Sequence, residues 1–116
     1  MTLDTAAIKQ EAHKAAQDAG LAYLQEHYNG DDWGACGFAW VRIMPQHKGN
    51  TKLGKAERVV LRELGFELNY TGKSYDWWNP SGLGCQNVEA KAKGAGAAVR
   101  VLRQYGYLPV AMSRLD

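Results

Sequence analysis

The fold depends most on residues 35–44, Ala35-Cys36-Gly37-Phe38-Ala39-Trp40-Val41-Arg42-Ile43-Met44. Successive side chains of a strand point to opposite faces. The two sets here are Phe38, Trp40 and Arg42 against Ala39, Val41 and Ile43. Both sets are largely apolar, which is typical of a strand in the middle of a sheet. Pro45 follows the segment and ends it.

Segments with other periodicities flank this strand. Spacings of three and four residues predict helices over 4–28, 51–64 and 87–105. Alternation predicts short strands at 66–70 and 108–112, and 75–78 could form one more. The order α-β-α-β-α-β predicts one α+β domain over residues 1–116, with three helices packed on a small mixed sheet. Pro109 makes the last strand an edge candidate.

Apolar stripes predict which side of each helix is buried. They are Ile8, Ala12, Ala15, Ala19 and Tyr23 in the first helix, Leu53, Ala56 or Glu57, Val60 and Leu64 in the second, and Val88, Ala92, Ala95, Val99 and Leu102 in the third. Gly94 and Gly96 lower the helix propensity of the third. That helix is therefore expected to need close backbone approach, to a strand or to a ligand.

Composition indicates a small soluble globular protein. The chain has 116 residues, of which 46% are hydrophobic and 22% charged, so intrinsic disorder is not expected. The N-terminus lacks the features of a signal peptide, and the longest apolar run is too short to span a membrane. We therefore expect a cytoplasmic protein without a membrane association. No cofactor motif is present, and the oligomeric state is open.

Charge is unevenly distributed along the chain. Residues 1–32 carry two basic and six acidic residues, a net charge of −4, and residues 33–116 carry 12 basic and six acidic residues, a net charge of +6. Within 42–62 the basic residues are Arg42, Lys48, Lys52, Lys55, Arg58 and Arg62, against Glu57 alone. This basic stretch could face a nucleotide-like anion or nucleic acid. Alternatively, it is a solvated face paired with the acidic first helix.

The irregular segment 71–86 contains the strongest candidate binding site. Tyr75, Asp76, Trp77, Trp78 and Asn79 follow one another there. Long loops are often functional, and exposed tryptophans can stack on a base or sugar or anchor an interface. Adjacent tryptophans on an extended segment point to opposite sides, so one could pack in the core while the other faces out. Alternatively, the segment covers the sheet with both rings buried.

Cysteine chemistry is a second hypothesis. Cys36 could act as the nucleophile of a small hydrolase or transferase, with His47, His13 or His27 as base. Against it, the residues after Cys36 predict a strand, whereas an activated thiol often lies at a helix N-terminus. Both Cys36 and Cys85 are expected to be small buried hydrophobes without a disulfide, and the histidines lack metal-site spacing.

Three short motifs, Cys36-Gly37-Phe38-Ala39-Trp40-Val41, Trp78-Asn79-Pro80-Ser81 and Ser113-Arg114-Leu115-Asp116, resemble a family of small uncharacterised proteins of tailed bacteriophages and prophages. The resemblance spans roughly residues 33–116 and brings no catalytic residues with it. It implies expression inside an infected bacterium. With the missing catalytic signature, it favours a non-enzymatic binder with a counter-defence role, which acts on a host or defence protein or sequesters a nucleotide-like anion.

Overall fold

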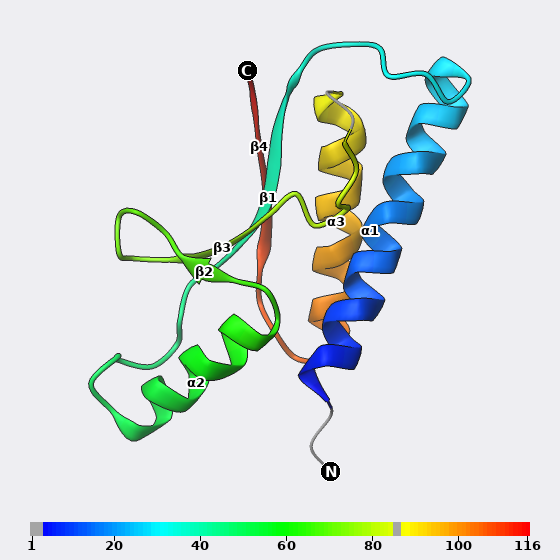
Figure 1. Ribbon diagram of the computed structural model, residues 1–116. Helices are drawn as coiled ribbons and strands as arrows, with labels where there is room; N and C mark the ends of the chain where they lie inside the picture. The colour runs from blue at the N-terminus through cyan, green and yellow to red at the C-terminus, as the bar shows by residue number, and fades with distance from the viewer. Residues whose placement is uncertain (1–3, 85–86) are drawn as a thin grey trace.

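The computed structural model describes residues 4–84 and 87–116. The elements are α1 (Thr5–Tyr28), β1 (Gly37–Ile43), α2 (Lys52–Glu63), β2 (Glu67–Leu68), β3 (Tyr75–Trp78), α3 (Val88–Gln104) and β4 (Val110–Leu115) (Figure 1). The α+β class and the predicted order are confirmed, and the additional strand at 75–78 forms as β3. No helix among the described residues is long and apolar enough to cross a membrane.

The four strands form one sheet in the order β2-β3-β1-β4. β1 is central, as predicted, and β4 is an edge strand that begins directly after Pro109. The expectation of a mixed sheet is corrected, because all three described pairings are antiparallel. β1 and β2 are both antiparallel to β3 and therefore run in the same direction, so the connection through α2 is a crossover with β3 inserted between the two strands. The connection from β3 through α3 to β4 is a second crossover of this kind, with β1 inserted.

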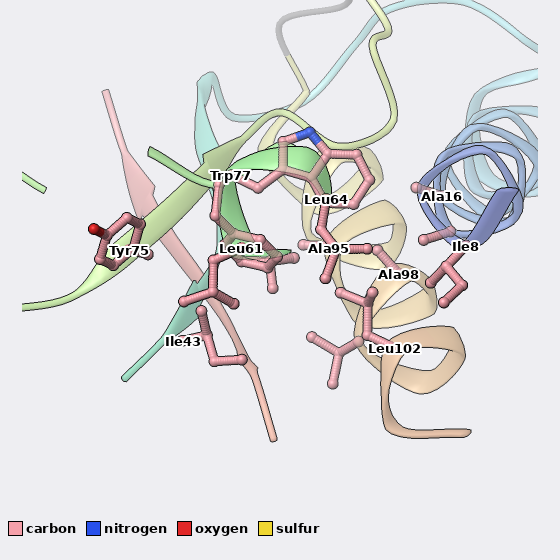
Figure 2. Close-up of a cluster of buried hydrophobic side chains, with 14 of the residues drawn as sticks. Ile8, Ala16, Ile43, Leu61, Leu64, Tyr75, Trp77, Ala95, Ala98 and Leu102 are labelled. Carbon is pink, nitrogen blue, oxygen red and sulfur yellow. The ribbon is translucent and has the colours of Figure 1, made fainter. Parts of the chain in front are cut away.

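The two faces of β1 have different neighbours. Ala39, Val41 and Ile43 are buried on the helical side. There they join a core to which all three helices contribute, as Figure 2 shows for Leu61 and Leu64 and for Leu102. Phe38, Trp40 and Arg42 point to the opposite side, which we call the open face. The alternation of this strand therefore separates a packed side of the sheet from a side that no described helix covers.

α1 and α3 lie side by side (Figure 1) and pack through small residues. α1 buries Ile8, Ala12, Ala16, Gly20 and Leu24. The predicted stripe is thus correct at Ile8 and Ala12. Along the rest of α1 the buried side is shifted by one residue, so that Ala16, Gly20 and Leu24 are buried in place of the predicted Ala15, Ala19 and Tyr23. A Cβ at Gly94 would lie 2.9 Å from the Ala16 carbonyl oxygen, whereas one at Gly96 would meet only the end of the Arg100 side chain, at 3.9 Å. Of the two glycines of α3, Gly94 therefore makes the close approach and Gly96 does not, and the partner is the backbone of α1.

α2 is attached mainly through its C-terminal half. Gly54 and Leu61 are buried on it, and Leu64 follows at its end. The predicted stripe is corrected at Leu53, which is 65% exposed. Leu53 and Val60 line a cavity of about 380 Å³ between α2 and the segment 106–108. The sequence pattern indicates an apolar side of α2, and the fold leaves most of it uncovered.

The contrast between the two glycines of α3 gives a stability prediction. Gly94→Ala should destabilise the fold by about 1–3 kcal/mol, because its Cβ would press on the α1 backbone. Gly96→Ala should stabilise it by up to about 1 kcal/mol, because the helix propensity improves and the position has space. Urea denaturation of both variants measures the two changes. Equal changes of one sign would contradict the described packing.

A second prediction concerns alkaline stability. The Tyr105 hydroxyl donates a hydrogen bond of 2.7 Å to Glu11, and this bond, with burial and the carboxylate charge, raises the pKa of Tyr105. A raised pKa in the folded state stabilises the fold below the unfolded pKa of about 10, and this contribution is lost as pH rises through the folded value. The free energy of unfolding should fall above about pH 10.

Tyr105→Phe should make that fall shallower, and urea midpoints between about pH 8 and 11 measure it. The matched control is Tyr70→Phe at a 97% exposed position, which leaves the Tyr105–Glu11 bond in place. A Tyr105→Phe profile identical to that of the wild type would show that this bond contributes nothing.

Candidate functional site

The register of the sheet defines the open face. Residues directly opposite each other in antiparallel strands share a face. Phe38 lies opposite Arg114, Trp40 lies opposite both Trp78 and Met112, and Arg42 lies opposite both Asp76 and Val110. β1, β3 and β4 thus bring together three aromatic rings, two arginines and one carboxylate from three distant segments.

The aromatic rings of this face form a contiguous cluster. Trp40 and Trp78 stack at 4.6 Å between ring centroids with an interplanar angle of 25°, and Phe38 meets Trp78 edge-on at 6.4 Å. Trp78 is 51% exposed and Phe38 38%, whereas Trp40 is only 7% exposed. Two rings are therefore accessible to a ligand, and the buried Trp40 ring packs against one of them, Trp78.

Trp40 also carries an unused hydrogen-bond donor. Its indole Nε1 is buried and has no hydrogen-bond partner among the described residues. Burying such a donor without an acceptor costs about 1–3 kcal/mol. Unpaired buried donors of this kind are rare in folded proteins and mark places where a ligand or water can supply the acceptor.

Arg42 and Asp76 form a bidentate ion pair beside the rings. Arg42 donates from Nε to Oδ1 at 2.9 Å and from Nη2 to Oδ2 at 3.2 Å, and Asn69 Nδ2 donates to the same Oδ2 at 2.5 Å. The hydrogen bonds to Asp76 raise the pKa of the Arg42 guanidinium. The Asp76 side chain is only 2% exposed, so the arginine compensates a buried charge and is not free to bind an anion.

Two further cations surround Phe38. The Arg114 guanidinium lies 5.5 Å from the ring centroid and the Lys91 ammonium 5.6 Å. Lys91 comes from α3, is almost fully buried and donates to the Gly37 carbonyl at 3.1 Å. Sequence reasoning missed both residues. Lys91 falls on the buried side of α3 between Val88 and Ala95, and a charged residue at such a position was the available signal.

The predicted aromatic segment divides between the two faces. Tyr75 and Trp77 are buried in the core, where Trp77 packs edge-on against Phe66 at 6.1 Å. Asp76 and Trp78 belong to the open face. Asn79 has a left-handed backbone with φ 46°, and its side chain donates to the Leu83 carbonyl, which fixes the following turn. The interpretation that one tryptophan packs inside and the other faces out is confirmed.

The predicted basic stretch does not join the aromatic cluster, except through Arg42. Lys48, Lys52 and Lys55 are exposed around the start of α2, which packs on the helical side of the sheet. Arg58 donates to the carbonyls of His47 and Gly54 and thereby fixes the loop before the helix. The described ion pairs, Lys14–Asp18, Arg42–Asp76 and Arg58–Glu57, do not link the stretch to α1.

The cysteine hypothesis finds no supporting geometry. Cys36 is exposed, which corrects the expectation that it is buried; Cys85 lies outside the described residues. Cys36 and His47 flank opposite ends of the seven-residue β1, which separates them by roughly 20 Å. His13 Nδ1 lies 2.7 Å from the Pro80 carbonyl, and His27 packs on Tyr23. No group of three possible metal ligands occurs in the described part of the chain.

The Arg42–Asp76 pair yields a third prediction. Arg42→Ala should lower the free energy of unfolding by about 2–3 kcal/mol, because the Asp76 carboxylate stays buried without its cation. Adding Asp76→Asn should recover part of this loss, since the uncompensated charge is removed. Urea denaturation of the two single variants and the double variant measures the coupling, with Arg62→Ala as the exposed control. Additive effects would show that the pair is not coupled.

The chain matches no protein family model, no curated protein and no solved structure.

Proposed function

We propose that this chain is a non-enzymatic binding protein and that the open face of its sheet is the binding surface. The observation that supports this most directly is the cluster of Phe38, Trp40 and Trp78 on the side of the sheet without helices. Tryptophan and arginine are the residues most enriched among those that dominate binding energy. On this face Phe38 lies between the two, with Trp78 of β3 at its edge and Arg114 of β4 over its ring.

The chemistry of the face supports binding better than catalysis. Its buried carboxylate, Asp76, is engaged by Arg42 and Asn69. No pair of nucleophile and base lies on it among the described residues. General acid–base or nucleophilic catalysis needs such a pair within hydrogen-bond reach. Flat aromatic rings beside an arginine suit a ligand that is held by stacking and charge.

The biological setting that we propose follows from the phage resemblance in the three sequence motifs. A small protein made in an infected cell and acting by binding would serve counter-defence, either by blocking a host or defence protein or by sequestering a nucleotide-like anion in the host cytoplasm. The same face serves both cases, because aromatic rings with an adjacent arginine bind protein hot spots as well as planar anions.

The fourth prediction tests the face without assuming its ligand. A photo-crosslinking residue at Val110, which is 46% exposed on the open face, leaves the aromatic cluster intact. In bacterial extract it should give discrete adducts, whereas the same residue at Lys14 on exposed α1 should give none. Unlabelled wild-type protein should compete for the adducts, and a Trp78→Ala variant should not. Equal yields from both positions, or equal competition by both proteins, would contradict the proposal.

A further inference from the structure

We infer that the open face binds single-stranded nucleic acid, with unpaired bases stacked on Trp78 and Phe38 and the phosphate backbone held by Arg114. This rests on the proposed function and specifies its ligand. A four-stranded sheet that is backed by helices and carries aromatic residues on its open face can stack two or three unpaired bases. The present sheet has this architecture.

The arrangement of the rings suits successive bases. Phe38 and Trp40 are two residues apart on β1, a step of about 6.6 Å along the strand. Trp78, opposite Trp40, has its centroid 6.4 Å from that of Phe38 and a different ring orientation. The face thus offers two separate accessible rings in adjacent rows, so two neighbouring bases can each find their own stacking partner.

The charges on the open face favour one side of the sheet for the bound nucleic acid. On the β2–β3 side, Glu67 lies opposite Asp76, and Arg42 is already used to compensate that carboxylate. On the β4 side, Arg114 is exposed and makes no ion pair among the described residues, and the Lys91 ammonium lies beneath the same ring. A polyanion is therefore attracted to the β1–β4 side and repelled from the β2 edge.

The shape of the face favours planar bases over a protein segment. Protein anchors usually fill pockets. Two cavities of the described structure lie elsewhere, one between α2 and the segment 106–108 and the other between α1 and α3. A base needs only an exposed ring to stack on.

The test is fluorescence anisotropy with labelled oligo(dT) and oligo(U) of about twelve nucleotides, within the range that one such module covers. Trp78→Ala should weaken binding by about 5- to 150-fold, the loss expected for one stacked base. Trp33→Ala is the matched control, because Trp33 is 68% exposed and lies in the loop before β1, outside the open face. Trp78→Phe should retain most of the affinity, since it keeps a ring.

The salt dependence separates the phosphate contact from stacking. Arg114→Ala should reduce the slope of log affinity against log salt concentration by about 0.7, the value for one phosphate contact with a single strand. Trp78→Ala should leave the slope unchanged. Arg100→Ala on the exposed side of α3 should change neither affinity nor slope.

Several outcomes would overturn the inference. Equal losses in Trp78→Ala and Trp33→Ala would show that the open face is not the specific stacking site. Duplex DNA that competes as well as single strands would show general electrostatic attraction. Mononucleotides that compete as well as the oligomer at equal base concentration would identify a free nucleotide as the ligand. If the protein binds no oligonucleotide but still forms adducts at Val110, the nucleic-acid inference is wrong. The proposed function then stands, with a protein as the partner. Failure of both experiments would reject the binding surface itself.

Discussion

The strict alternation of side chains along β1 is the constraint on which the rest of the structure depends. Val41 and its two neighbours on the helical side are almost inaccessible, and the helices assemble on them. The same backbone then obliges Phe38, Trp40 and Arg42 to face the other way. A one-residue slip of this strand would bury the arginine in the core and expose the valine. The core and the candidate site are therefore fixed by one register.

The parts of the fold that the sequence predicted are those that depend on local pattern. The central strand and the three helices follow from periodicity. The direction of the strands did not follow, because pairing is a non-local choice. The rotation of the buried side of α1 was also missed, because alanines stand on several of its sides and only contact with α3 selects among them.

The part of the candidate site that lies in one segment of the sequence was predictable, and the part contributed by distant segments was not. The sequence placed Trp78 in a binding segment because Trp77 and Trp78 are adjacent. It could not place Arg114 and Lys91 beside Phe38, because these contacts are made by β4 and α3 and cross most of the chain. The basic stretch was predicted to bind an anion because its charges follow one another in the sequence. In the structure Arg42 pairs with Asp76, and Arg58 donates to a backbone carbonyl. A charge count along the sequence does not distinguish a cation that is available to a ligand from one that is already paired within the fold.

The pairing of β1 with β4 has a consequence for the order in which the protein can form. Phe38 and Arg114 belong to segments that are far apart in the sequence. Contacts between residues so far apart in the sequence form late, because a large loop must close first. Such contacts therefore lower the folding rate. Helices α1 and α3 can meet before β4 is placed, but the open face cannot. The binding surface is therefore a property of the finished tertiary structure, and no peptide cut from this sequence would reproduce it.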